Sequence, residues 1–134
     1  MTERVNIREL ALETLLAVGR DGEKSHQVIR NVLEKYQYLP RQERAFFTRL
    51  CEGTLEYRIR LDYILDAFSR TPAAGMKPVI RELLRMGVYQ LRYMDAVPDS
   101  AAVNEAVKLA ARKGFRNLKG FVNGVLRSVA RNPG

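Results

Sequence analysis

Three segments in the second half of the chain decide its fold class. They are LLRMGVYQLRYM at residues 83–94, VPDSAAVNEAVKLAARKG at residues 97–114 and LKGFVNGVLRSVAR at residues 118–131. In each segment apolar residues recur at steps of three and four, which places them on one face of a helix. No segment alternates apolar and polar residues for long enough to form a half-buried strand. The pattern therefore predicts three amphipathic helices with short connections.

Short polar segments mark the helix boundaries in this region. VPDS interrupts the apolar pattern, and Asp99 or Ser100 can cap a helix over residues 101–113. Gly114 suits the C-terminal stop of that helix, because glycine readily adopts the left-handed conformation on which many helices end. Asn117 is then expected to open the last helix.

The first half of the chain follows the same periodicity. Helices are predicted over residues 4–19, from Ser25 to Tyr36, and from Leu39-Pro40 onward. Residues 59–68 either continue this third helix or form a following helix after a break near Tyr57. Thr2 or Asn6 can cap the first of these helices, and Gly19 and then Asp21-Gly22 can end it. RTPAAGMK at residues 70–77 is expected to connect two helices within one domain, since connections of this length are ordinary and too short to indicate a domain linker. We therefore predict one all-α domain, a bundle of about seven helices.

The positive charge is concentrated near the C-terminus. The net charge is +8 and the pI about 10.0. Residues 106–134 contain seven basic residues and no acid, whereas residues 1–105 hold the other 16 basic residues and all 15 acids. The seven are Lys108, Arg112, Lys113, Arg116, Lys119, Arg127 and Arg131. Because like charges repel, this segment predicts a polyanionic partner, with nucleic acid favoured over a membrane surface or an acidic protein.

The sequence lacks the patterns of a catalytic or metal site. Cys51 is the one cysteine and His26 the one histidine, which argues against a disulfide or a zinc site. Cys51 is expected in the core and His26 in solvent near a helix start. Glu105 in VNEAV is expected to form a structural ion pair or a cap. No glycine-rich loop follows a strand, so no catalytic residue, metal or cofactor is predicted within this chain.

The chain has no membrane or export signal in its sequence pattern. No apolar run approaches the roughly 18 residues that cross a bilayer. The opening MTERVNIREL is charged from its start, unlike a secretory signal. The predicted location is the cytoplasm.

Two glycines interrupt apolar helical patterns. Gly87 in LLRMGVYQL and Gly124 in FVNGVLR each cost about 1 kcal/mol relative to Ala, so a neighbouring helix is expected to approach closely at both. Asn123 is then expected to bond a neighbouring backbone group, with a direct RNA contact as the alternative. Tyr89 and Tyr93 are expected to pack in the protein rather than stack on bases.

The three C-terminal segments, in this order and spacing, resemble the NusB-like domain. That domain occurs as the free antitermination factor NusB and as the N-terminal part of the RsmB (Sun or Fmu) 16S rRNA cytosine-C5 methyltransferases. VNIRELALETLLAV at residues 5–18 resembles the methyltransferase version, in which Asn-x-Arg precedes an Ala-x-x-x-Leu helix. YQLRYM and VLRSVAR also resemble that branch, and only Arg4 and Arg8 stand where free NusB has a cluster of arginines. The resemblance covers about residues 5–131.

The resemblance implies a NusB-like bundle of about seven helices in two small helical subdomains, which docks the enzyme onto 16S rRNA. It also implies a C-terminal Rossmann-like domain that binds S-adenosylmethionine and holds the catalytic cysteines. Asn132-Pro133-Gly134, directly after the last motif, is expected to be a boundary in the linker to that domain. The implied partners are 16S rRNA and this catalytic domain, with neither a membrane nor a metal.

The charge pattern also predicts which residues contact RNA. The expected surface contains Lys108, Arg112, Lys113, Arg116 and Lys119. Phe115, between them, is expected in the core, with stacking on an unpaired base as the alternative. The resemblance to NusB, whose first helix contacts RNA, implies that Arg4 and Arg8 extend this surface.

Two other functions fit the same sequence. One is a free NusB-type antitermination factor that binds a leader RNA and a small ribosomal protein. The other is a helical protein-interaction module without an RNA role, whose basic segment contacts only its own second domain.

Overall fold

The computed structural model describes residues 4–21 and 24–133 of the chain. These residues form seven α-helices and two short 3-10 helices, and none of them lies in a strand. The α-helices are α1 (Ile7–Asp21), α2 (Ser25–Lys35), α3 (Arg41–Glu56), α4 (Arg58–Phe68), α5 (Pro78–Tyr93), α6 (Asp99–Arg112) and α7 (Lys119–Arg131), and the 3-10 helices are η1 (Ala73–Gly75) and η2 (Arg116–Leu118). None of these described helices is both long and apolar enough to span a membrane. The predicted all-α class is confirmed. Of the two alternatives left open near Tyr57, the structure has a following helix, since α3 ends at Glu56 and α4 begins at Arg58.

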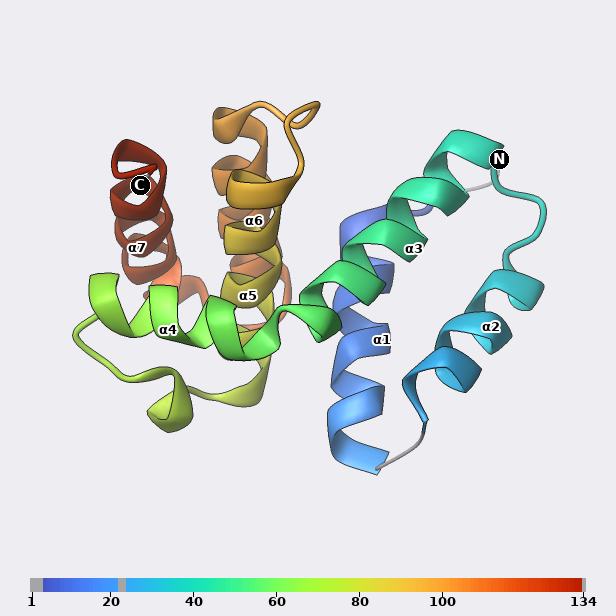
Figure 1. The fold of residues 1–134 in the computed structure, drawn as a ribbon, viewed down its shortest axis with the longest axis horizontal. Coiled ribbons are helices and arrows are strands. Elements are labelled where there is room, and N and C mark those ends of the chain that lie inside the picture. The colour runs from blue at the N-terminus through green and yellow to red at the C-terminus, as the bar shows by residue number, and fades with distance from the viewer. Residues whose placement is uncertain (1–3, 22–23, 134) are drawn as a thin grey trace.

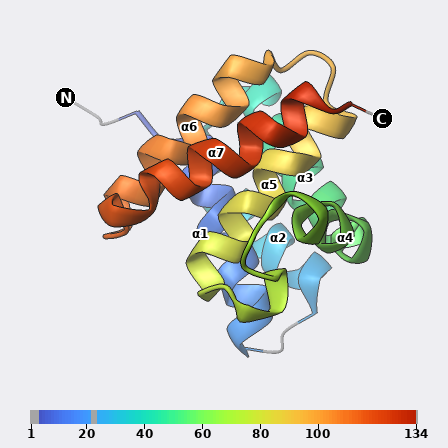
Figure 2. The ribbon, with the colours of Figure 1, turned by 90° about the vertical axis from the view of Figure 1, so that its left-hand side faces the viewer.

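Helix α5 lies between two groups of helices. Helices α1, α2 and α3 form one group, and α4, α6 and α7 form the other (Figure 1). Helix α5 packs against α1 and α3 of the first group and against α4, α6 and α7 of the second. Helices α6 and α7 lie side by side (Figure 2). The two subdomains that the NusB-like resemblance implies are present and share α5.

Burial is greatest along α5, where every residue from 83 to 90 is buried. A helix that is enclosed on all sides needs small residues where a neighbour comes close. Gly87 is such a position, because a Cβ there would lie 2.8 Å from Cδ1 of Leu126 on α7. The close approach predicted at Gly87 is confirmed. Gly53 on α3 is a second case, since a Cβ there would overlap the ring of Tyr89.

The close approach predicted at Gly124 is wrong. Gly124 is exposed, and no atom outside its own helix backbone lies within 4 Å of the position that its Cβ would take. Asn123 does not bond a neighbouring backbone group, because its Oδ1 accepts a hydrogen bond from Nε of Arg127 at 3.0 Å. Apolar neighbours in the sequence suggested an enclosed site, but the pair lies towards the outer side of α7.

A buried ion-pair cluster joins α4 to α5. Arg85 is 8% exposed, and its guanidinium binds both oxygens of Asp62, with Nε–Oδ1 and Nη2–Oδ2 distances of 2.7 Å. Its Nη1 also donates to Oε2 of Glu82 at 2.5 Å. A buried guanidinium requires such partners because an unpaired charge in the interior is costly.

Two predicted helix termini are confirmed. Asn6 caps α1, because its Oδ1 accepts a hydrogen bond from the Glu9 N–H at 2.9 Å. Gly114 follows α6 with a φ of 89°, the left-handed conformation expected of a glycine stop. Three residues of these predictions lie outside the described part of the chain. They are the alternative cap Thr2, the stop residue Gly22 and the boundary residue Gly134.

Three other predicted termini are wrong. Ser25 and Asp99 are the first residues of their helices, and the cap positions belong to Lys24 and Pro98, which make no side-chain cap bond. Proline suits that place because its fixed φ, here −61°, is compatible with extended backbone. Asn117 lies within η2, and α7 begins at Lys119.

Candidate nucleic-acid interface

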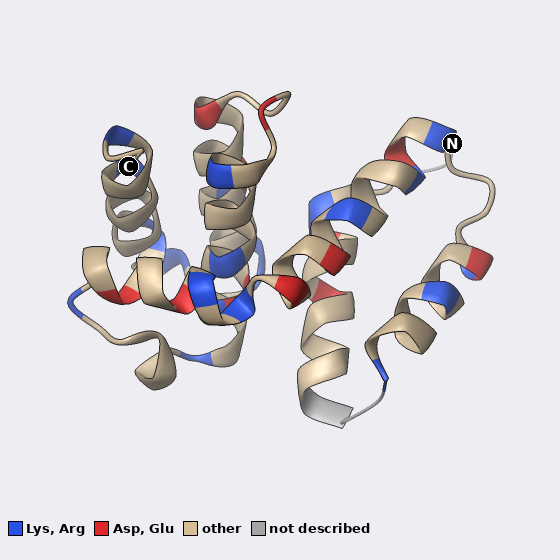
Figure 3. Cartoon of the chain, in the orientation of Figure 1, with Lys and Arg blue, Asp and Glu red and all other residues tan. Residues whose placement is uncertain are grey.

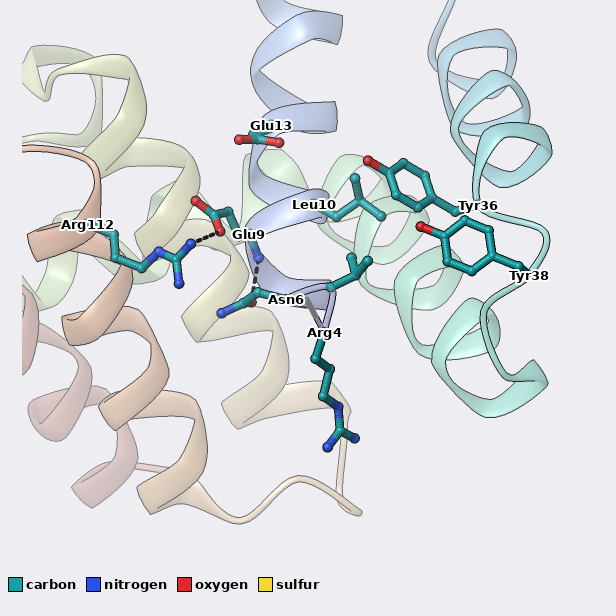
Figure 4. A pocket seen from close by; sticks show the side chains of 9 residues that line it. Arg4, Asn6, Glu9, Leu10, Glu13, Tyr36, Tyr38 and Arg112 are labelled. Carbon is teal, nitrogen blue, oxygen red and sulfur yellow. Dashed lines mark hydrogen bonds and ion pairs between the residues drawn. The ribbon is translucent and has the colours of Figure 1, made fainter. Parts of the chain in front are cut away.

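The end of α6 carries two of the predicted RNA-contacting residues, and both bind acids on α1. Nη2 of Arg112 lies 2.8 Å from Oε1 of Glu9, and Nζ of Lys113 lies 3.0 Å from Oε2 of the same carboxylate. Lys113 also lies 2.8 Å from Oε2 of Glu13. Figure 4 shows Arg112 reaching across to Glu9 at the start of α1. Four charges of two signs therefore join α1 to α6.

This pairing reduces the free charge that the sequence suggested. Glu9 and Glu13 are distant in the chain from Lys113 but adjacent to it in space. The hydrogen bond to Glu13 is the main reason that the pKa of Lys113 is raised above its ordinary value. Lys108 is also paired, with Nζ 3.3 Å from Oε2 of Glu105 on the same helix. The predicted structural ion pair of Glu105 is confirmed.

Unpaired positive charge is found further along, on η2 and α7. Arg116 and Lys119 are exposed, and neither has an acidic partner among the described residues. Arg127 and Arg131 are exposed too and bond only Asn123 and Ser128, which are uncharged. Helix α7 carries no acidic residue (Figure 3). We call Arg116, Lys119, Arg127 and Arg131 the α7 basic surface.

Arg4 and Arg8 lie in different environments. The side chain of Arg4 is 91% exposed, and its Nη2 is 3.9 Å from Oε1 of Glu43. Arg8 is half-buried, with Nε donating to Oε1 of Gln90 at 2.7 Å and its guanidinium carbon 5.0 Å from the centre of the Phe46 ring. Burial lowers the pKa of Arg8, although the charge of Glu105 opposes this effect. Arg4 is therefore open to a ligand, whereas Arg8 holds α1 against α3 and α5.

Two clefts flank the start of α1. One, of about 560 Å³, is lined by Arg4, Val5, Asn6, Glu9, Leu10, Glu13, Tyr36, Tyr38 and Arg112 (Figure 4). The other, of about 620 Å³, is lined by Arg4, Val5, Asn6, Ile7, Arg8, Gln42, Glu43, Phe46, Glu105 and Arg112. Arg4 and Arg112 line both clefts. Chain segments about a hundred residues apart thus supply cations to the same depressions.

Tyr36 and Tyr38 are site residues that the sequence patterns did not indicate. Tyr38 is 70% exposed, and its ring centre lies 5.9 Å from that of Tyr36. The one signal in the sequence is YQYLP, in which two tyrosines stand in a short connection before a proline. That signal does not show which helix the rings face, and the structure places them opposite α1 (Figure 4).

The aromatic residues that the sequence did single out are packed. Tyr89 is 5% exposed, and its ring stacks with those of Tyr57 and Tyr93 at 6.2 and 5.3 Å between ring centres. Phe115 is partly buried against the hydrophobic core. The predicted packing of Tyr89 and Tyr93 and the predicted core position of Phe115 are confirmed.

The described residues contain no group of three or more His, Cys, Asp or Glu side chains that could hold a metal ion. Cys51 is fully buried, as predicted, and burial raises the pKa of its thiol, so it is neither ionised nor accessible. His26 is exposed near the start of α2, also as predicted. The exposed cations of the α7 basic surface and of Arg4 suit the binding of an anion.

Known proteins resemble this chain in sequence over nearly its whole length. A model of the NusB family matches residues 5–131. The chain is 37% identical over 129 residues to the probable ribosomal RNA small subunit methyltransferase B of Bacillus subtilis (strain 168), with 96% of this chain and 28% of that protein covered. It is 32% identical over 133 residues to the transcription antitermination protein NusB of Nocardioides sp. (strain ATCC BAA-499 / JS614), with 98% of this chain and 96% of that protein covered. The chain therefore spans less than a third of the methyltransferase but nearly all of NusB.

Solved structures show the same fold. A chain in the "Crystal Structure of Antitermination Factors NusB and NusE in complex with dsRNA" superimposes with a TM-score of 0.83 at 20% identity, with 93% of each chain covered. The arrangement of helices and the match over residues 5–131 lead to the same conclusion. The chain belongs to the NusB family.

Proposed function

We propose that this chain is the RNA-docking N-terminal domain of a 16S ribosomal RNA cytosine-C5 methyltransferase. The observation that carries RNA docking is the α7 basic surface, on which four exposed cations have no acidic partner among the described residues. Lys and Arg on such a surface neutralise phosphates and release counterions, which supplies affinity with little reading of base sequence.

The proposed contact surface continues from α7 to the start of α1. The side chains of Arg116, Lys119 and Arg4 are exposed and can contact phosphates directly. Arg112 first has to exchange Glu9 for a phosphate, and Lys113 has to exchange both Glu9 and Glu13. Lys108, paired with Glu105, extends the surface along α6.

The methyltransferase assignment is supported by the relatives. Identity is 37% to methyltransferase B of Bacillus subtilis and 32% to NusB of Nocardioides. In the proposed protein, S-adenosylmethionine and the catalytic cysteines belong to a second domain. The described residues of this chain are helical and offer no strand followed by a glycine-rich loop, so they do not fit that cofactor. Docking would hold the target cytosine within reach of that domain.

A titration across a salt series tests RNA docking. The protein is mixed with a labelled helix fragment of small-subunit rRNA, beside a variant carrying Arg116→Glu and Lys119→Glu. A control variant carries Arg60→Glu and Arg70→Glu, which reverse two exposed arginines on and just after α4. We expect the first variant to lose RNA affinity and the control to bind like wild type. In the first variant the slope of log affinity against log salt concentration should be smaller in magnitude by about 1.5, because each of the two lost phosphate contacts contributes roughly 0.7–0.9. Equal weak binding by all three proteins would contradict docking through α7 and favour a protein-interaction module.

A second candidate is a free NusB-type antitermination factor, and a specific observation favours it. The NusB relative from Nocardioides is covered over 96% of its length, as a free factor of this size would be. The discriminating observation is the coding sequence that follows residue 134. A stop codon there would support the free factor, and a methyltransferase domain would exclude it.

A further inference from the structure

Tyr38 is one of four large hydrophobic residues that are exposed in the described part of the chain. Its ring lies beside that of Tyr36 at 5.9 Å between centres, with the two planes inclined by 43°. Both rings line the cleft of about 560 Å³ at the start of α1 (Figure 4). An exposed ring at the edge of a polar cleft has the form of a stacking platform, because every nucleobase has a π-face.

Backbone hydrogen bonds fix the connection between α2 and α3 that carries this aromatic pair. The Tyr36 N–H donates to the Val32 carbonyl at 2.9 Å, and the Leu39 N–H donates to the Tyr36 carbonyl at 3.0 Å. Nζ of Lys35 lies 5.6 Å from the centre of the Tyr36 ring. Pro40 then restricts the backbone before α3 begins. A restrained backbone lowers the conformational entropy that is lost when a base stacks on a ring it carries.

The opposite wall of the cleft offers groups for the rest of a nucleotide. Arg4 and Arg112 have side chains that are 91% and 59% exposed, and both line the cleft. Asn6 uses its Oδ1 to cap α1, which leaves its Nδ2 without a partner among the described residues. The carboxylate of Glu13, 54% exposed, can accept a hydrogen bond from a base edge. Cations, an amide and an acceptor thus face two aromatic rings.

We propose that Tyr38, backed by Tyr36, stacks on one unpaired base of a single-stranded RNA segment whose flanking phosphates reach Arg4 and Arg112. The proposal rests on the RNA docking proposed above and specifies its ligand further, as RNA with at least one splayed base. Single strands suit this site because their bases can leave the stack, whereas the bases of a duplex are enclosed.

The test compares two RNA probes and two tyrosines. The probes are a short single-stranded RNA carrying 2-aminopurine and an RNA duplex of the same length. The variant is Tyr38→Ala, and Tyr38→Phe keeps the ring. Tyr63→Ala is the matched control, since Tyr63 is 74% exposed but lies on α4, away from the cleft. Because both side chains are exposed, we expect all variants to fold, which their circular dichroism and urea unfolding would check.

We expect Tyr38→Ala to weaken single-strand binding at least about fivefold while duplex affinity stays unchanged. Tyr38→Phe and Tyr63→Ala should bind like wild type, and 2-aminopurine fluorescence should be quenched by every protein except Tyr38→Ala. Unchanged single-strand affinity in Tyr38→Ala would overturn the stacking site, as would an equal loss on the duplex. If the Arg116→Glu, Lys119→Glu variant still loses affinity in that case, RNA docking stands without the stacking site. If wild type binds neither probe, both proposals fall.

Discussion

At the scale of single residues, Gly53 shows how tightly α3 packs against α5. A Cβ at this position would overlap the ring of Tyr89, which is 5% exposed and has little room to move. We expect Gly53→Ala to lower the free energy of unfolding by about 1–3 kcal/mol, because overpacking a filled core forces neighbours to shift. Urea unfolding followed by circular dichroism measures the change.

Gly124→Ala is the matched control for that substitution. A Cβ added to Gly124 would have no atom within 4 Å apart from the backbone of its own helix, so the new methyl group causes no clash. We expect this variant to gain about 0.5–1 kcal/mol, the ordinary difference between Gly and Ala inside a helix. Equal effects of the same sign at both glycines would contradict the packing described for α3 and α5.

Lys113 gives a prediction about pH. The hydrogen bond to Glu13, together with that to Glu9, raises the pKa of Lys113 above its ordinary value of 10.5. A lysine with a raised folded-state pKa stabilises the fold fully below its unfolded pKa, and that contribution is lost as the pH rises through the folded value. We expect the stability difference between wild type and Lys113→Met to be constant from about pH 7 to 9 and to shrink above 10.5. Urea unfolding at several pH values checks this, and a difference that grew above 10.5 would be inconsistent with the ion pairs.

At the scale of elements, Glu9 links α1 to α6 by binding Arg112 and Lys113 together. Glu9→Gln should therefore have opposite effects on stability and on RNA binding. Stability should fall by about 1 kcal/mol, as for a partly exposed ion-pair network. RNA affinity should rise, and the salt slope should increase by about one phosphate, because Arg112 is released while Lys113 keeps its ion pair with Glu13.

Glu56→Gln is the control for the effect of net charge alone. Glu56 is an exposed acid at the end of α3, with no ion pair among the described residues. Titration of both variants with the same RNA separates the local effect from the global one. A loss of RNA affinity in Glu9→Gln would mean that Glu9 orients Arg112 for RNA instead of competing with it.

Periodicity predicted the helices well but their ends less well. Apolar spacing is a local property of the chain, so it indicated every helical segment but left open whether α3 and α4 are one helix or two. The stop at Gly114 could be expected from glycine's preference for the left-handed conformation. The cap positions depend on where the backbone first becomes helical, and Pro98 takes that place without a side-chain bond where Asp99 or Ser100 was expected. Gly124 was misread because apolar sequence neighbours do not show whether another helix lies opposite.

At the scale of the whole molecule, charge counted along the sequence differs from charge in space. The chain showed seven basic residues without a nearby acid in its last segment. Folding brings Glu9 and Glu13 from the first helix against Arg112 and Lys113, which leaves the α7 basic surface as the unpaired part. The position of Tyr36 and Tyr38 on the same cleft as the start of α1 likewise depends on tertiary structure, so no local pattern could predict it.

The most direct test of RNA docking is an NMR titration of the isotope-labelled domain with a single-stranded fragment of small-subunit rRNA. We predict that amide shifts change for residues 112–120, around Arg127 and Arg131, for residues 36–39 and at the start of α1, and that added salt reverses them. Helix α4, with its exposed Ile59 and Tyr63, should keep its shifts. Changes confined to α4, or no saturable change at all, would contradict docking through the α7 basic surface and the start of α1.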